Sequence, residues 1–249
     1  MVVLKTGREL EIMKEACRIS AGALKLIGQA IEPGVSTGEL DRMAEKYILS
    51  QGGKPNFKNY NGYPATARIS INNEVIHGIP SFSRKIKEGD IVSVDLGASF
   101  EGYNGDNAAT FAAGDVSPEA KRLMDTTRES LYEGIKMARA GGRIGDISHA
   151  IQSYVEARGY SVVRQFVGHG IGTKLHEAPE VPNFGNSGRG VRLLPGMTLA
   201  IEPMINIGSY DVKIQPDGWT VLTADGSLSA HFEHTVAITP NGPVIMTTP

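Results

Sequence analysis

Two segments near the start of the chain carry apolar residues at the spacing of amphipathic helices. Thr6 and Glu9 form a capping-box pattern ahead of the first segment, and Ser36 and Glu39 repeat this pattern ahead of the second. The apolar face of the first segment consists of Leu10, Met13, Cys17, Leu24 and Ile27. The pattern predicts a pair of helices, the second of which stops at the glycines 52–53.

A second helix pair is predicted in the other half of the chain. Ser117 and Pro118 match an N-cap and a first helical residue, and this helix is expected to run to the glycines 141–142. A further helix is expected from about 146 to 158, where Gly159 ends it. Each pair is followed by β-rich sequence, with strand candidates at 68–71, 91–97, 107–113, 197–202, 219–223 and 230–238.

The chain contains an internal repeat at a constant offset of 107 positions. At this offset residues 33–52 align with 140–159, and residues 88–95 align with 195–202 without a gap. The alignment places Asp95 on Glu202, so two acidic residues occupy equivalent positions. We therefore predict an α+β fold with two similar halves, about 1–113 and 114–249, which share one sheet in a single domain over 1–249.

Acidic residues interrupt apolar strands at three places. Asp95 lies in IVSVDLG, Glu202 in MTLAIEP and Glu233 in SAHFEHTVAI. Acidic residues are depleted in strands and are rarely buried without a partner. One such residue would fit an exposed sheet face or a buried ion pair. A set of them, with few cations nearby in the sequence, indicates a functional site instead.

A predicted hairpin adds a fourth acidic residue to this set. The sequence DLGASFEGYNGDNAATF predicts two strands that turn at residues 101–102. With this turn Asp95 stands opposite Ala108, and Asp106 lies diagonally from Asp95 on the same face. Diagonal β-carbons are roughly 7–8 Å apart, which suits two carboxylates that share metal ions. A three-residue loop would instead place the two acids on opposite faces of the sheet.

A histidine between glycines adds a nitrogen ligand to these acids. His169 lies in FVGHGIG, where the glycines allow close approach of the backbone. The sequence lacks the HExxH, P-loop and GxGxxG patterns, so this glycine-rich string does not indicate a phosphate site. Four converging carboxylates would repel one another, and two divalent cations would cancel their charge. Paired metals about 3.5–4 Å apart are a known hydrolytic arrangement.

Composition and charge limit the other classes of function. The 249 residues are 41 % apolar and 21 % charged, with 25 Lys and Arg against 27 Asp and Glu, a net charge of -2 and a pI near 6.3. No global positive charge favours nucleic acid or anionic membranes. Cys17 is the single cysteine, which excludes an internal disulfide and a cysteine-rich zinc module. Without an early secretory apolar segment or a run of ~18 apolar residues, we expect a cytoplasmic protein with no membrane contact.

At these residues the sequence resembles the type I methionine aminopeptidases, which have the pita-bread metallopeptidase fold. The resemblance covers essentially the whole chain. It is carried by ISINNEVIHGIPS (69–81), DLGASFEGYNGD (95–106), FVGHGIGTKLHEAPEVPNF (166–184), LAIEPM (199–204) and HFEHTV (231–236). The resemblance implies a curved, mostly antiparallel sheet with helix pairs packed on it, and the internal repeat then corresponds to the pseudo-two-fold axis of this fold.

The resemblance also assigns the metal ligands and the catalytic groups. It implies that Asp95, Asp106, His169, Glu202 and Glu233 bind two divalent ions, which would be Co, Mn, Fe or Zn. Glu202 would also accept the proton of the attacking water. In a separate role, His176 would stabilise the oxyanion, and His77 would contact the peptide beyond the cleaved bond.

A substrate pocket and several departures from the family follow from the same comparison. The resemblance places Phe57, Tyr60, Tyr63, Arg68 and Trp219 around the side chain of the N-terminal residue. Arg68 and Phe57 replace frequent cysteines, Leu175 replaces a frequent phenylalanine, and Gly97 and Asn107 replace hydroxyl residues that often support the metal-binding acids.

Two further positions concern the surroundings of the metals. His231 replaces a residue that is usually Gln-like. In a strand it would share a face with Glu233, so it is expected near the metals, whereas His234 should point away. Asn72 and Glu74 match a loop that in this family can hold a monovalent cation through backbone oxygens.

The implied activity is removal of N-terminal methionine from peptides and nascent chains when the second residue is small. A monomer, with ribosome association as a further partner and no nucleic-acid site, completes the expectation. One alternative is a prolidase-type or Xaa-Pro peptidase of the same fold, which typically has an additional N-terminal domain. The other is a non-catalytic pita-bread binding module, which would not need all five ligands.

Overall fold

Four α-helices form two pairs in this computed structural model, which describes residues 2–248. The helices are α1 (Gly7–Ala30), α2 (Thr37–Ser50), α3 (Pro118–Met137) and α4 (Ile144–Glu156). The predicted capping boxes are confirmed at the starts of α1 and α2, where Thr6 and Ser36 each accept a hydrogen bond from the backbone N–H of a glutamate three residues on. Helix α3 begins as predicted but ends at Met137, four residues before the expected glycines.

The strands alternate with these helix pairs along the chain. The first half contains β1 (Lys54–Pro55), a short 3-10 helix (Tyr60–Gly62), β2 (Ala67–Ile71), β3 (Glu74–Ile76), β4 (Ile91–Phe100) and β5 (Tyr103–Ala112). The second half contains β6 (Ser161–Val162), β7 (Gly168–Gly170), β8 (Glu177–Val181), β9 (Thr198–Ile201), β10 (Met204–Asn206), β11 (Val212–Ile214), β12 (Val221–Thr223), β13 (Ser229–His231), β14 (Glu233–Thr239) and β15 (Gly242–Ile245).

One antiparallel nine-stranded sheet joins the two halves. Its order is β1-β4-β5-β14-β9-β7-β8, with β2 beside β4 and β15 beside β14. The junction is the pairing of β5 with β14, where Ala108 stands opposite Glu233. The hairpin register is confirmed, because Phe100 pairs with Tyr103 and Asp95 pairs with Ala108.

The predicted strand 230–238 is wrong at Phe232, where the chain passes from one sheet to another. Strand β13 pairs with β10 in a separate three-stranded sheet, whereas β14 pairs with β5, β9 and β15. The backbone N–H of Phe232 donates to the Pro203 carbonyl instead of to a neighbouring strand. Alternating apolar residues on both sides of Phe232 conceal this change of sheet in the sequence.

The structure repeats at the offset of 107 that the sequence predicts. This offset relates the ends of α1 and α3, the starts of α2 and α4, both residues of β1 and β6, and the starts of β4 and β9. Two isolated bridges, Ser36 with Lys85 and Arg143 with Arg192, are related in the same way. Gly34 and its equivalent Gly141 both have φ above +90°, a backbone conformation that explains why glycine occupies both positions.

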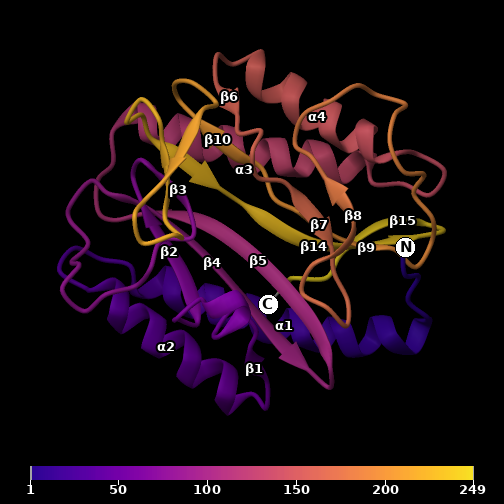
Figure 1. Cartoon of the computed structure of the whole chain (residues 1–249), viewed down its shortest axis with the longest axis horizontal. Helices are drawn as coiled ribbons and strands as arrows, with labels where there is room; N and C mark the ends of the chain where they lie inside the picture. The colour runs from indigo at the N-terminus through magenta and orange to yellow at the C-terminus, as the bar shows by residue number, and fades with distance from the viewer. Residues whose placement is uncertain (1, 249) are drawn as a thin grey trace.

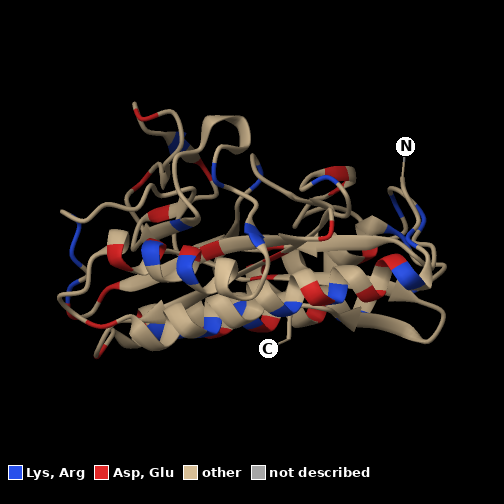
Figure 2. Ribbon diagram, turned by 90° about the horizontal axis from the view of Figure 1, so that it is seen from below, with Lys and Arg blue, Asp and Glu red and all other residues tan. Residues whose placement is uncertain are grey.

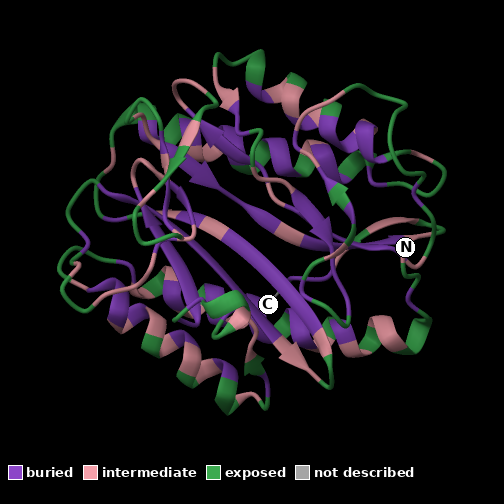
Figure 3. Ribbon diagram, in the orientation of Figure 1, coloured by how far each residue is buried: buried purple, intermediate pink, exposed green. Residues whose placement is uncertain are grey.

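The helices cover one side of the large sheet, and α1 packs on β4 and β5 (Figure 1). In the perpendicular view of Figure 2, helices and strands form successive layers, and long loops lie on the side away from the helices. Figure 3 shows the central strands largely buried and the outward sides of the helices exposed. Within residues 2–248, no helix combines the length and the apolar character that a membrane crossing would require.

Candidate metal centre

The pairing of three adjacent strands aligns acidic side chains on one face of the sheet. Asp95 of β4 stands opposite Ala108 of β5, and Ala108 stands opposite Glu233 of β14. Asp106 lies two residues before Ala108 on β5, so its side chain projects from this same face. The register of the three strands is therefore sufficient to bring one carboxylate from each strand to the same face of the sheet.

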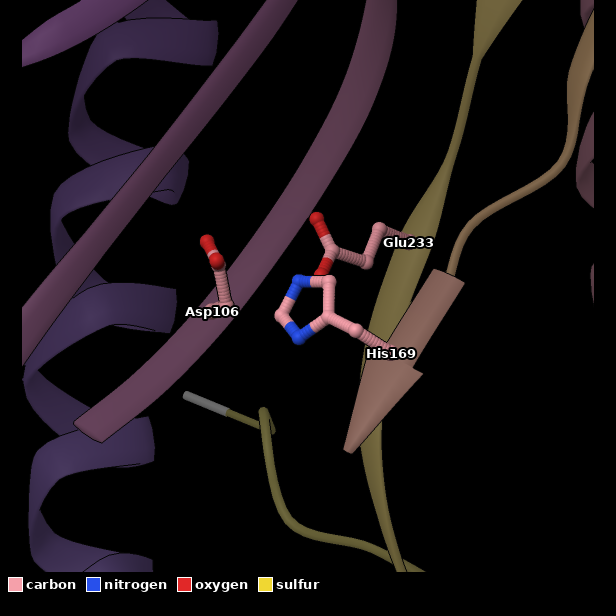
Figure 4. Close-up of side chains that lie close together, drawn as sticks. All are labelled: Asp106, His169 and Glu233. Carbon is pink, nitrogen blue, oxygen red and sulfur yellow. The ribbon is translucent and has the colours of Figure 1, made fainter. Parts of the chain in front are cut away.

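Two neighbouring strands add an imidazole and a fourth carboxylate. His169 of β7 stands opposite Ala200 of β9, and Glu202 follows directly after the end of β9. The Nε2 atom of His169 lies 3.6 Å from Oε1 of Glu202. Figure 4 shows Asp106, His169 and Glu233 pointing toward one another from β5, β7 and β14.

The converging side chains form two groups with metal-ligand spacing. Asp106, His169 and Glu233 place ligand atoms within 4.8 Å of one another, and Glu202, His231 and Glu233 do the same. Glu233 belongs to both groups, so it is placed as a bridging ligand would be. The Nε2 atom of His231 lies 3.5 Å from Oε2 of Glu202.

A backbone contact determines which nitrogen of His169 is available. Its Nδ1 atom lies 2.8 Å from the carbonyl oxygen of Gly170. A carbonyl can only accept a hydrogen bond, so the proton must be on Nδ1. The neutral ring then has its lone pair on Nε2, the atom that faces Glu202.

Unpaired buried polar atoms show that this donor set fits metal ions. One carboxylate oxygen each of Asp95, Asp106 and Glu233, and both ring nitrogens of His231, are buried without a hydrogen-bond partner. Leaving a buried polar atom unpaired costs free energy, so such a concentration in a native fold requires an explanation. Divalent cations accept carboxylate and imidazole ligands and would satisfy these atoms together.

The electrostatics of the centre favour binding of cations. Burial, followed by repulsion from neighbouring carboxylates, raises the pKa values of Asp106, Glu202 and Glu233 well above their usual range. Among the described residues, Arg68 is the only lysine or arginine that lines this cavity. Four carboxyl groups thus face a single cation of the protein, and divalent ions would supply the missing positive charge.

The surrounding histidines are held neutral by their environment. Burial, with a smaller effect of His176, lowers the pKa of His169 to about 3. Burial and then Arg68 lower the pKa of His176 to about 4, and burial is also the largest cause that lowers the pKa of His231 to about 4. The pKa of His77 is likewise well below its usual value, mainly through burial. Neutral imidazoles can serve as metal ligands or as hydrogen-bond donors to a substrate.

 The predicted metal ligands and catalytic histidines surround a cavity of about 120 Å³. The cavity is lined by Arg68, His77, Asp95, Asp106, His169, His176, Glu202 and Glu233, together with Ile76, Phe166 and Val167. These last three residues are not among the site residues predicted from the sequence. Their positions in the sequence could have indicated them, because Ile76 directly precedes His77, and Phe166 and Val167 begin the segment that contains His169.

The two other histidines of the cavity are placed by local backbone and aromatic contacts. His77 follows the end of β3 with a φ of 63°, a strained conformation for a residue that is not glycine. Its ring packs edge-on against Phe166 and Trp219. The Nδ1 atom of His176 lies 2.8 Å from the hydroxyl of Tyr60, and its ring centroid lies 4.2 Å from that of His169.

The aromatic residues expected around the substrate side chain divide into two sets. Phe57 and Tyr63 are fully buried and do not line the cavity, and the Tyr63 hydroxyl donates to the carbonyls of Ala67 and Gly78. Trp219 packs edge-on against Tyr63, and Tyr60 contacts His176. Phe57 is separated from the cavity by Arg68, whose guanidinium lies over the Phe57 ring and lines the cavity.

The structure shows the neighbours of several residues that differ from the pattern of the resembled family. A side chain at Gly97 would collide with the amide of Asn56, which occupies that space. Asn107 faces the opposite side of the sheet, where its Oδ1 accepts a hydrogen bond from Ser20 of α1. Leu175 is buried in the core of the first half. His234 points away from the cavity and contacts Thr247 and Tyr132.

Comparisons with known proteins agree with this geometry. The sequence profile of Metallopeptidase family M24 matches residues 11–240. The chain is 54 % identical over 247 residues to a methionine aminopeptidase of Clostridium perfringens, with 99 % of both chains covered. It is 52 % identical over 247 residues to methionine aminopeptidase 1 of Bacillus subtilis, again with 99 % of both chains covered.

Solved structures distinguish between members of the fold. A crystal structure of the methionine aminopeptidase from Thermotoga maritima matches with a TM-score of 0.99 and 46 % identity, and each chain is covered completely. A prolidase from Pyrococcus furiosus matches with a TM-score of 0.81 and 24 % identity, over 99 % of this chain and 66 % of the prolidase, which shows a shared fold alone. From its fold, its cluster of metal ligands and its full-length relatives, the chain belongs to metallopeptidase family M24 and, within it, to the methionine aminopeptidases.

Proposed function

We propose that this chain is a methionyl aminopeptidase that removes N-terminal methionine from peptides and nascent proteins when the second residue is small. The observation that carries this proposal is the convergence of four carboxylates and His169 on one cavity, in a chain whose full-length relatives are named methionine aminopeptidases. A non-catalytic binding module would not need this costly concentration of unpaired buried ligands.

The proposed ligands of two divalent ions are Asp95, Asp106, His169, Glu202 and Glu233. The shared membership of Glu233 in both ligand groups supports a bridging role for it, and Asp106 lies beside it on the neighbouring strand. The mixture of carboxylates and imidazole suits Co, Mn, Fe or Zn, and availability in the cell would decide among them. When bound, such ions activate water and polarise the scissile carbonyl.

Glu202 is the proposed proton acceptor of the reaction. Its raised pKa supports this role, because a carboxylate with a higher pKa is a stronger base toward the proton of water. Its main chain is held by Asn183, whose amide donates to the Glu202 carbonyl at 3.0 Å. Glu202 would then return the proton to the departing amine.

His176 and His77 are the proposed contacts to the peptide. A hydrogen bond from the Tyr60 hydroxyl to Nδ1 of His176 would place the ring proton on Nε2. A neutral His176 with this tautomer can donate a hydrogen bond to the oxyanion that forms on the scissile carbonyl. His77 lies further along the cavity wall and would contact the peptide beyond the cleaved bond.

The proposed pocket for the methionine side chain is formed by Tyr60, Trp219 and Arg68, with the fully buried Phe57 packed behind Arg68 and the fully buried Tyr63 packed behind Trp219. Aromatic rings offer favourable contacts to a thioether, and Trp219 and Tyr63 already pack together at this side of the centre. Arg68 distinguishes this pocket from a purely apolar one, because its guanidinium lies between Phe57 and the cavity.

A monovalent cation near Asn72 is a further proposal. Asn72 has a φ of 56° and lies between β2 and β3, where its carbonyl accepts a hydrogen bond from Ser229. A carbonyl oxygen has a second lone pair, which remains free to bind a cation. Addition of K⁺ or Na⁺ to protein in a choline buffer should raise the melting temperature if the site exists.

The remaining proposals concern the chain as a whole. We propose that residues 1–249 act as one catalytic domain and as a monomer, because the ligands come from both halves of a single sheet. Nascent chains as substrates favour action in the cytoplasm and association with the ribosome. Basic and acidic residues are interspersed along the ribbons of Figure 2, which gives no support for a nucleic-acid site on this view of the described residues.

The test is a Glu202→Gln variant assayed on Met-Ala-Ser, with metal content measured in parallel. We expect an unchanged fold and a loss of turnover of about 10²-fold or more. A Glu11→Gln variant on the exposed side of α1 is the matched control and should keep full activity. Substantial activity of the Glu202 variant would remove this residue from the mechanism, and preferred cleavage of Gly-Pro would favour the prolidase alternative.

A further inference from the structure

Arg68 occupies an unusual position beside the proposed metal ligands. It lies on β2 directly opposite Asp95 on β4, and its Nη1 atom donates to Oδ2 of Asp95 at 3.0 Å. Both side chains are more than nine-tenths buried. On its other side the guanidinium lies over the Phe57 ring, 3.8 Å from the centroid. The charge is therefore held in place by a carboxylate and an aromatic face.

Asp95 differs from the other acids of the cavity in a corresponding way. The two groups with metal-ligand spacing include Asp106, Glu202 and Glu233 but not Asp95. One oxygen of Asp95 already accepts from Arg68, and the other has no hydrogen-bond partner. Within residues 2–248, Asp95 is thus the one carboxylate of the cavity that pairs with a lysine or arginine of the protein itself.

We propose that Arg68 is an internal counter-cation that competes with a divalent ion for Asp95. This inference rests on the proposed metal-dependent function. An arginine side chain stays protonated in proteins, so its charge persists when ions bind. A divalent ion at Asp95 has to displace the guanidinium, because two cations on one carboxylate would repel each other at short distance in a poorly solvated cavity. Arg68 therefore weakens binding of the ion at Asp95.

Calorimetric titration of the metal-free protein with Mn²⁺ measures this competition directly. An Arg68→Met variant, which removes the charge and keeps much of the length, should bind its weakest ion about tenfold more tightly or better. An Arg68→Lys variant retains the charge and should stay close to the unmodified chain. Arg18→Met removes a surface arginine that pairs with Glu15 on α1, and it should leave the affinity unchanged. Equal affinities of the Arg68→Met variant and the unmodified chain would overturn the proposal.

A second measurement requires no variant and covers the case in which Arg68→Met does not fold. In crystals of the unmodified protein soaked with Mn²⁺, an ion bound to Asp95 should be accompanied by loss of the hydrogen bond between Arg68 and Asp95. An ion on Asp95 with this hydrogen bond intact would show that the two cations do not compete. If the unmodified chain bound no ion and cleaved no peptide, the proposed function would fail instead.

Discussion

Tyr60 illustrates how a single hydroxyl can orient a proposed catalytic group. Its oxygen lies 2.8 Å from Nδ1 of His176, and no other hydrogen bond of the His176 ring occurs among the described residues. Tyr60 would thus act as a positioning residue, through the tautomer and the orientation of the imidazole. The tautomer of His169 is set in a similar way, because its Nδ1–H donates a hydrogen bond to the Gly170 carbonyl.

A Tyr60→Phe variant should therefore lower kcat on Met-Ala-Ser by about tenfold, the value of one lost hydrogen bond. Metal content and melting temperature should stay the same, because the ring and its packing remain. Steady-state kinetics at saturating substrate measure the effect, with Tyr210→Phe on the exposed surface as the control. A change in KM alone would argue against the positioning role.

Cys17 provides a second test at the residue scale. Burial raises the pKa of its thiol, which lies in the core under β5. The thiolate is the reactive form, so the native protein should react very slowly with a thiol reagent at pH 8. Spectrophotometric titration with dithionitrobenzoate should detect one thiol per chain after unfolding in guanidinium chloride. Rapid reaction of the native protein would show that the core around α1 opens readily.

The limits of sequence reasoning are also visible at single residues. Asp95 and Asp106 could be placed on one face because a two-residue turn determines their register. The contact of Arg68 with Asp95 depends on pairing of β2 with β4, which no tight turn sets. The sequence therefore could not predict that Arg68 contacts Asp95, and only the three-dimensional structure shows it.

At the scale of elements, strong local signals were sufficient to predict the helix starts and the hairpin. The capping boxes at Thr6 and Ser36 are short patterns whose hydrogen bonds lie within four residues. The change of sheet at Phe232 depends on partners distant in the sequence, since β13 pairs with β10 and β14 pairs with β5. A local pattern cannot contain that information.

Removal of the N-cap of α2 tests how much the capping hydrogen bond contributes to the stability of the fold. A Ser36→Ala variant loses the side-chain bond that the Glu39 N–H donates to Ser36 Oγ, and it should be less stable by about 1 kcal/mol. Urea denaturation measures the free energy of unfolding, with Ser50→Ala near the other end of the helix as the control. A loss as small as that of the control would mean that the cap contributes nothing.

At the scale of the molecule, the two similar halves build one centre. Asp95 and Asp106 come from the first half, and His169, Glu202 and Glu233 come from the second. The offset of 107 relates Asp95 to Glu202, and the junction of β5 with β14 brings the two halves into one sheet. The repeat was detectable in the sequence because its glycines and acids keep the same spacing.

Metal binding at this centre should be linked to protons. The pKa values of Asp106, Glu202 and Glu233 are raised without metal, so these groups hold protons to higher pH than they would in the unfolded chain. Divalent ions bind the deprotonated carboxylates, so binding should release protons and the apparent affinity should increase as the pH rises. Calorimetry at pH 7 in buffers of different ionisation enthalpy measures the protons released. Proton uptake on binding would contradict the prediction.

Anomalous diffraction from crystals soaked with Mn²⁺ is the most direct measurement of the central claim. The account predicts anomalous peaks within coordination distance of Asp106, His169 and Glu233, with Glu202 completing the shell. Peaks elsewhere, or no peak at these side chains in protein that still cleaves Met-Ala-Ser, would contradict it.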